Sequence, residues 1–204
     1  MKKKLIKNLL ILFTLGALSS FSLPPFNFFL INFFTFSIFF IFLFKKLHIK
    51  SNKKIFFYYG WFFGFGYFLT NLYWITISLT FDQNFNYLIP VALILIPAFL
   101  ALFYGIVTLL FYIFNFRNLI ASFFMFSLLF GLIEYVRGNI LTGFPWNLII
   151  YSLSENINFL SFISVIGTYS FNLLVISFFV SPAIYILRKS KKEIMVLFIF
   201  LLIP

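Results

Sequence analysis

YLIPVALILIPAFLALFYGIVTLLFYIF, residues 87–114, is the stretch that decides the fold, because it runs for 28 residues without a charged side chain. A helix needs about 20 apolar residues to cross the hydrocarbon layer of a bilayer, which is about 30 Å thick. The stretch therefore predicts a membrane-spanning helix, in which Pro90 and Pro97 are expected to introduce kinks.

The composition of the whole chain points the same way. Of its 204 residues, 63% are hydrophobic and 9% are charged, and the mean hydropathy is +1.10, whereas soluble domains carry about 25% charged residues. No water-soluble core hides this much apolar surface, so lipid is the expected solvent. The 37 phenylalanines are interpreted as compositional bias. The absence of cysteine excludes a disulfide framework, a thiolate metal site and a cysteine nucleophile within these residues.

Further apolar runs flank this stretch and predict an all-α fold, a polytopic bundle of transmembrane helices. The predicted complete spans are Leu5–Phe21, Phe26–Phe44, Ile55–Leu79, Tyr87–Phe114, Leu119–Tyr135 and Tyr169–Leu187. A truncated seventh span begins at Ile194 and reaches Pro204. The basic start of the chain also fits a signal peptide, but Ser19–Ser22 lead straight into two prolines without a small-x-small cleavage site, so an uncleaved helix is favoured.

The distribution of lysine and arginine predicts the orientation in the membrane. If the N-terminus is cytoplasmic, 14 of the 15 basic residues fall in cytoplasmic segments, and Arg137 alone lies outside. Such a bias sets topology by the positive-inside rule. We therefore expect a cytoplasmic N-terminus and an outer-face loop segment at 136–168. The basic residues that give the net charge of +11 then serve to orient the helices in the membrane, and no nucleic-acid partner is expected.

The last apolar run gives an expectation about the extent of the protein. Residues 194–204 cover about 16 Å at 1.5 Å per residue, about half a bilayer. Ending a span there leaves backbone carbonyls in hydrocarbon without partners. We therefore expect residues 1–204 to be a membrane helix-bundle domain that is truncated before an extracytoplasmic continuation.

Glu134–Tyr151, EYVRGNILTGFPWNLIIY, gathers charged, aromatic and turn-forming residues between apolar runs. Glu134 and Arg137 are three residues apart, so they project from one helix face and can pair. Charges at the end of a membrane helix are costly and informative. Two interpretations stay open: the pair closes the outer end of the helix, or it shapes the mouth of a site in which Arg137 faces a lipid phosphate.

The sequence Gly143-Phe144-Pro145-Trp146-Asn147 predicts a fixed turn. Gly143 permits an unusual φ and Pro145 fixes one, so the rings of Phe144 and Trp146 are held in defined directions. The turn is either an aromatic anchor at the membrane interface or the floor of a lipid-substrate site, to which Tyr151 could contribute a hydroxyl.

Glycines in the run 55–79 predict close packing. Gly60 and Gly64 are four residues apart, a spacing that allows two membrane helices to approach closely. A nucleotide-binding loop at Gly64-x-Gly66 is rejected because no strand precedes it. His48 lies among lysines and is interpreted as a loop residue rather than a metal ligand. No cofactor or metal is expected.

Taken in order, these motifs resemble the membrane domain of the apolipoprotein N-acyltransferase family. The residues that carry the resemblance are Pro24–Asn27, Gly60-Trp61, Phe63-Gly64, Gly66, Tyr73-Trp74, Glu134, Arg137, Gly143–Asn147, Tyr151, Gly167 and Tyr169–Phe171. The resemblance covers essentially the whole chain. Ile150 departs from it, since the family often has glycine at that position.

The resemblance implies a multi-pass enzyme of the bacterial cytoplasmic (inner) membrane. Such an enzyme moves an acyl chain from a phospholipid donor to the N-terminal diacylglyceryl-cysteine of a lipoprotein acceptor, and it is expected to be a monomer. It implies a cysteine thioester in a periplasmic nitrilase-like domain, with Glu, Lys and Cys as the catalytic set. Residues 1–204 contain no match to that set, so the chain alone is expected to be inactive and to hold lipid substrates. The implied membrane-mouth residues are Glu134, Arg137, Phe144, Trp146 and Tyr151.

Two other functions stay open from the residues alone. A small transporter or channel subunit would use helices kinked at Pro90, Pro97 and Pro182, although the spans carry no ionisable residue near their middle and no internal repeat. A non-catalytic membrane scaffold would use the segment 134–151 to dock a partner.

Overall fold

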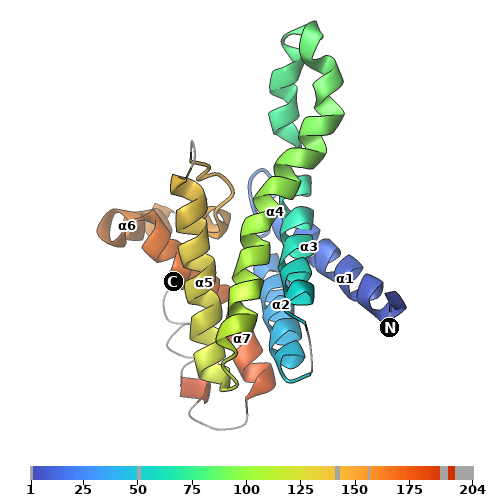
Figure 1. The fold of residues 1–204 in the computed structure, drawn as a ribbon. Helices are drawn as coiled ribbons and strands as arrows, with labels where there is room; N and C mark the ends of the chain where they lie inside the picture. The colour runs from blue at the N-terminus through green and yellow to red at the C-terminus, as the bar shows by residue number, and fades with distance from the viewer. Residues whose placement is uncertain (1, 50–51, 141–142, 156, 189–192, 196–204) are drawn as a thin grey trace.

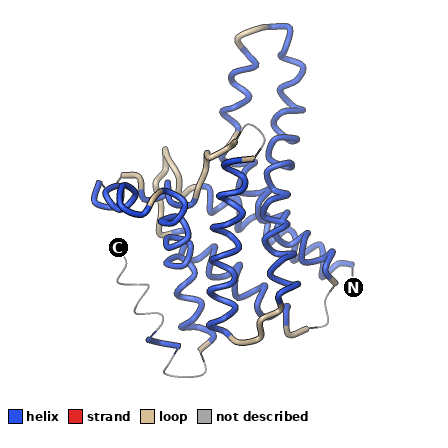
Figure 2. Tube along the Cα trace, turned by 60° about the vertical axis from the view of Figure 1, so that its left-hand side comes forward, coloured by secondary structure: helices blue, strands red, loops and turns tan. Residues whose placement is uncertain are grey.

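The computed structural model describes residues 2–49, 52–140, 143–155, 157–188 and 193–195 (Figure 1). The described part of the chain contains helices and no strands (Figure 2), which confirms the all-α prediction. The α-helices are α1 (Lys2–Ser20), α2 (Ile31–Leu47), α3 (Lys53–Asn71), α4 (Ile89–Phe114), α5 (Leu119–Asn139), α6 (Ile157–Ile166) and α7 (Thr168–Leu187). The 3-10 helices are η1 (Tyr73–Thr80), η2 (Gln83–Leu88) and η3 (Ile149–Leu153).

Three helical segments are long and apolar enough to cross a membrane: Gln83–Phe114, α5 and α7. A fourth is obtained if α3 and η1, which are bent by 47° at their junction, are counted as one broken span. Helix α2 is shorter, with 17 residues, and α1 begins with four lysines in its first six residues. The predicted number of six complete spans therefore stays a prediction, and most of the predicted seventh run lies outside the described residues.

The second and third predicted spans differ most from the observed helices, and the fifth helix runs on to Asn139 rather than Tyr135. The second helix begins at Ile31 rather than Phe26, because Pro24 and Pro25 and a left-handed Asn27 (φ 56°) hold the chain in turns up to Leu30. The third helix ends at Asn71 rather than Leu79. Beyond it the chain bends into η1, turns near Asp82, and returns through η2 into α4. This hairpin projects beyond the bundle (Figure 1) and buries none of its 3-10 residues.

Glycines allow α3 to pack closely on both of its main neighbours. A Cβ at Gly60 would lie 2.1 Å from the carbonyl oxygen of Tyr104 on α4, and a Cβ at Gly64 would lie 2.9 Å from the Tyr104 Cβ. The predicted close helix contact is thus confirmed, and its partner is α4. On the opposite side of α3, a Cβ at Gly66 would lie 2.1 Å from the backbone carbonyl of Phe13 on α1.

Phenylalanine fills the interior between α2, α3, α4 and α5. The rings of Phe39 and Phe63 stack with centroids 4.1 Å apart, and Phe126 meets Phe39 and Phe40 edge-on. Offset and edge-to-face ring pairs of this kind add stability beyond the apolar area that they bury. The aromatic core fixes the position of α5, which carries the charged residues Glu134 and Arg137 at its end.

The two ends of the bundle differ. Helix α5 ends, and the Gly-Phe-Pro-Trp turn follows, at the end from which the η1–η2 hairpin projects (Figure 1). The segment 136–168 also contains η3 and α6, and α6 lies across the bundle rather than along it (Figure 1). The end of α2, the start of α3 and the loop that joins α4 to α5 lie at the opposite end (Figure 1). The turn and its supporting residues therefore occupy the end with the hairpin.

The close contact at Gly60 can be tested by adding a single methyl group. Because the new Cβ would collide with backbone of α4, we expect Gly60→Ala to lower the free energy of unfolding by about 1–3 kcal/mol, as overpacking does. The matched control is Gly105→Ala, whose Cβ would meet only the movable ring of Phe57 at 2.7 Å. Thermal unfolding of the purified chain in detergent measures both. Equal melting temperatures for the two variants would contradict the close packing of α3 on α4.

Candidate functional site

The last turns of α5 carry an ion pair that lies inside the protein. Arg137 Nη2 lies 3.8 Å from Glu134 Oε1, and both side chains are 0% exposed. The two residues project from one helix face and pair, which confirms the expectation from their spacing. Burying two charges costs several kcal/mol per ion unless other groups satisfy them. The partners of each side chain therefore decide what the pair does.

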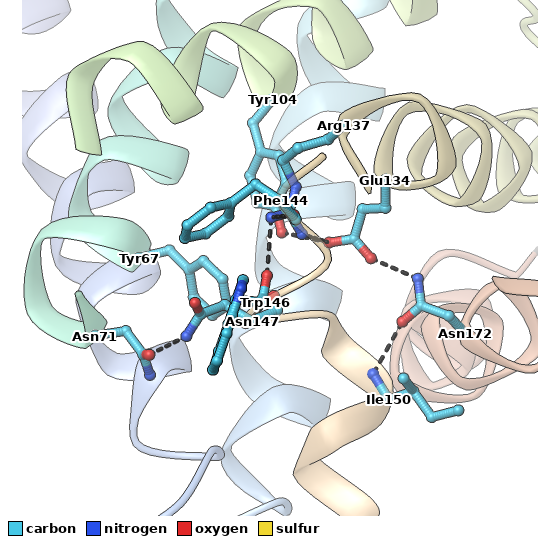
Figure 3. Close-up of polar contacts among 10 residues, drawn as sticks. All are labelled: Tyr67, Asn71, Tyr104, Glu134, Arg137, Phe144, Trp146, Asn147, Ile150 and Asn172. Carbon is cyan, nitrogen blue, oxygen red and sulfur yellow. Dashed lines mark hydrogen bonds and ion pairs between the residues drawn. The ribbon is translucent and has the colours of Figure 1, made fainter. Parts of the chain in front are cut away.

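The Glu134 carboxylate joins three helices and the segment after the turn (Figure 3). The hydroxyl of Tyr104 on α4 donates to Oε1 at 2.8 Å, and Asn172 Nδ2 on α7 donates to Oε2. The Oδ1 of Asn172 in turn accepts from the backbone N–H of Ile150 at 2.9 Å. A charge that accepts this many hydrogen bonds is held in place and satisfied, so Glu134 acts as the hub of a buried polar network.

Arg137 holds the backbone of the turn. Its Nη1 donates to the carbonyl oxygens of Phe144 at 2.9 Å and Trp146 at 2.8 Å (Figure 3). The backbone N–H of Phe144 donates to the Arg137 carbonyl at 3.1 Å, and the guanidinium lies 5.3 Å from the ring centroid of Phe68. Hydrogen bonds from a charged donor are about twice as strong as neutral ones. The Arg137 side chain is buried, so it supports the turn from the protein interior.

The turn is also tied to α3. Gly143 (φ 74°) and Asn147 (φ 58°) adopt left-handed backbone conformations, which confirms the role expected of Gly143. The Nδ2 of Asn147 donates to Asn71 Oδ1, at the last residue of α3. The hydroxyl of Tyr67 donates to the Asn147 carbonyl at 3.0 Å. The turn is therefore fixed at both of its ends, by α5 and by α3.

The two aromatic rings of the turn differ in their exposure to solvent. Trp146 is 55% exposed, and its ring lies 5.5 Å from that of Trp74 at the start of η1. Phe144 is half-buried and lines a cavity of about 280 Å³ between α4 and the turn. The cavity is walled by Leu95, Ile96, Phe99, Leu100 and Phe103 of α4 and by Arg137, Ile140, Gly143 and Phe144. Its lining is mostly apolar, as expected of a site that takes a hydrocarbon chain.

Tyr151 lies in η3 and is partly buried. It packs against the hydrophobic core and does not line the cavity beside Phe144. Burial, followed by the neighbouring Tyr169, raises the pKa of the Tyr151 phenol above its ordinary value near 10. The hydroxyl therefore stays protonated at neutral pH and can donate a hydrogen bond.

The sequence predicted five site residues, and the structure gathers four of them. Glu134, Arg137, Phe144 and Trp146 are connected through one network, and Tyr151 stands to one side. Sequence reasoning missed the supporting residues Tyr67, Asn71, Tyr104 and Asn172. A signal was available, since a lone Asn or Tyr within an apolar span needs a partner. Among the described residues, no group of His, Asp and Glu could hold a metal ion.

Comparison with known proteins identifies a family whose members resemble this chain. Residues 15–181 match the model of the apolipoprotein N-acyltransferase N-terminal domain. The chain is 36% identical over 182 residues to an apolipoprotein N-acyltransferase of Rhodopseudomonas palustris, covering 84% of this chain and 32% of the relative. The same name is carried by relatives from Rhizobium etli (34% identical, 87% and 34% covered) and Brucella melitensis (31% identical, 84% and 33% covered). The chain spans about a third of the length of the curated relatives that it matches.

The buried ion pair predicts which substitutions lower the free energy of unfolding most. Arg137→Met leaves Glu134 as an uncompensated buried charge and frees two carbonyls, so we expect a loss of about 3–5 kcal/mol, or roughly 10 °C in melting temperature. The double variant Glu134→Gln with Arg137→Met should lose less, because no charge is stranded.

The matched control for this series is Arg117→Met, which removes an exposed arginine from the loop between α4 and α5. It should melt within about 1 °C of the parent. Equal melting temperatures for the single variants Arg137→Met and Arg117→Met would contradict a structural role of the buried pair.

Proposed function

The chain belongs to the apolipoprotein N-acyltransferase family, and from this membership we propose that it forms the membrane part of an enzyme that acylates lipoproteins. In the proposed reaction, an acyl chain moves from a phospholipid to the N-terminal diacylglyceryl-cysteine of a lipoprotein. The observation that carries the proposal is the turn at residues 143–147, which a buried arginine fixes beside an apolar cavity within the region matched to the family.

The proposed task of this part is to hold lipid. Both substrates in the proposed reaction carry acyl chains, and the cavity of about 280 Å³ beside Phe144 has an apolar lining that suits one chain. The exposed ring of Trp146 then contacts the glycerol region at the mouth. Tyr151 lies outside this cavity, and its hydroxyl is proposed to donate to a headgroup or ester oxygen beyond the mouth. Glu134 and Arg137 shape this mouth by holding the turn. Keeping two lipids in register contributes to rate through proximity.

The chemical step is proposed to lie outside the residues described above. The sequence contains no cysteine, so it supplies no thiol nucleophile. We assign the thioester chemistry to a nitrilase-like domain with Glu, Lys and Cys, which the family resemblance implies. Under this assignment residues 1–204 are inactive alone, act as a monomer, and serve as the helix-bundle domain of the enzyme.

The proposed location is the bacterial inner membrane, with six complete spans and a cytoplasmic N-terminus. The apolar helices and the family support a membrane protein. The orientation is supported by the basic residues at one end of the bundle, where α2 ends, α3 begins and α4 joins α5. These residues are Lys45, Lys46, Lys53, Lys54 and Arg117. The turn and the hairpin lie at the other end and would then face the outer leaflet, in the outer-face segment 136–168.

The function is tested with a chimera, because this chain matches only part of each relative. Residues 15–181 replace the matching region of the Rhodopseudomonas palustris relative, and the chimera is expressed in a strain depleted of its own N-acyltransferase. We expect triacylated lipoprotein by mass spectrometry. Trp146→Ala in the chimera should lower the rate about 10- to 150-fold, since burying an aromatic ring against a lipid is worth about 1.5–3 kcal/mol.

The matched control is Phe124→Ala, which removes an exposed ring from α5 away from the turn and should leave the rate unchanged. A chimera that inserts and melts like the parent enzyme yet makes no triacylated lipoprotein would refute the proposed function. Full activity of Trp146→Ala would refute the proposed role of the turn.

The orientation has its own test, for which the absence of native cysteine is convenient. Single cysteines are placed at Asp82, near the tip of the hairpin, and at Phe116, in the loop between α4 and α5. A membrane-impermeant maleimide applied to spheroplasts should label Asp82→Cys and spare Phe116→Cys, while lysed membranes label both. The reverse pattern in spheroplasts would show that the proposed topology is inverted.

A further inference from the structure

A second groove lies at the bundle end remote from the turn, between the start of α3 and the end of α4. Its volume is about 330 Å³, within the range of small-ligand sites. The lining residues are Lys53, Lys54, Phe57, Tyr58, Leu109 and Ile113. The groove thus has two lysines at one end and mainly apolar side chains along the rest of its length.

The apolar part of the groove is built by close packing and opens toward the outside of the bundle. The ring of Phe57 packs onto Gly105 of α4, where a Cβ would lie 2.7 Å from a ring carbon. Tyr58 and Ile113 remain 49% and 57% exposed. Because α4 is long and apolar enough to cross a membrane, these exposed apolar groups are expected to face lipid tails.

The charged part of the groove has two lysines and no carboxylate among its lining residues. Neither Lys53 nor Lys54 forms an ion pair with a carboxylate among the described residues. Glu134 is buried in its own network at the opposite end, and Asp82 caps η2 in the hairpin. Glu155 accepts from Asn27 Nδ2, and Glu193 does not line the groove. Further cations stand at the same bundle end as the groove: Lys45 and Lys46 at the end of α2, and Arg117 after α4. The groove is therefore electropositive as well as amphiphilic.

We propose that this groove binds an anionic phospholipid, with the headgroup phosphate at Lys53 and Lys54 and one acyl chain along Phe57 and Ile113. Basic pockets between membrane helices bind anionic headgroups in this way, each lysine contributing about 1 kcal/mol. The apolar lining excludes a simple phosphate ion as the whole ligand, because it would leave most of the groove unfilled. The site is separate from the turn and from the proposed acyl transfer, and its lipid would brace α3 against α4.

Native mass spectrometry of the purified chain in detergent micelles tests this proposal, with 1-palmitoyl-2-oleoyl-phosphatidylglycerol as the probe. We expect a bound lipid whose affinity falls about 30-fold in Lys53→Gln with Lys54→Gln, the factor that corresponds to about 2 kcal/mol. Leu109→Trp, which fills the groove and keeps both lysines, should also lose the lipid.

The matched control is Lys45→Gln with Lys46→Gln, which removes the same charge from the same bundle end outside the groove. It should bind the lipid as the parent does. The proposal is overturned if both double variants lose affinity equally, if phosphatidylcholine with the same chains binds as tightly, or if glycerol phosphate displaces the lipid at similar concentration. Melting curves measured without added lipid show that each variant is folded, so a loss of lipid binding is not caused by unfolding.

Discussion

A buried arginine that bonds to two backbone carbonyls is the interaction on which the rest of this structure depends. Arg137 donates to the carbonyls of Phe144 and Trp146, and Glu134 beside it accepts from Tyr104 and Asn172. Both hydrogen bonds come from Nη1, whose two N–H donors lie in the fixed plane of the guanidinium, whereas the donors of a lysine ammonium rotate. The charge of each side chain would be costly inside the protein, so each requires the other and the surrounding hydrogen bonds.

The network turns a loop into a rigid part of the bundle. The turn is held to α5 through Arg137 and to α3 through the pair Asn147 and Asn71. Asn71 is the last residue of α3, where the chain bends into the hairpin, and Trp74 just beyond packs on Trp146. The position of the exposed ring, the bend of the third helix and the cavity on α4 are therefore parts of one arrangement. Lipid held there would meet a preformed site.

The sequence predicted the helices from their apolar runs, the pairing of Glu134 with Arg137 and the left-handed Gly143, because each depends on neighbours within a few residues. It did not predict the break after Asn71, the 3-10 helices η1, η2 and η3, or α6. An apolar run that is hydrophobic on every face predicts a helix but carries no periodic signal for where it bends. The partners of Glu134 come from 30 and 38 residues away in the chain, so only the fold could identify Tyr104 and Asn172.

Hydrogen–deuterium exchange of the amides in residues 143–148 tests the central claim most directly, since it reports on the turn itself. In the parent chain the amides of Gly143 and Phe144, which donate to the carbonyls of Ile140 and Arg137, should exchange slowly. Arg137→Met should speed their exchange by about 100-fold, because it releases the turn from α5, and should leave the amides of α3 and α4 near Gly60 unchanged. Exchange of these two amides that is already fast in the parent, or that Arg137→Met leaves unaltered, would contradict the account.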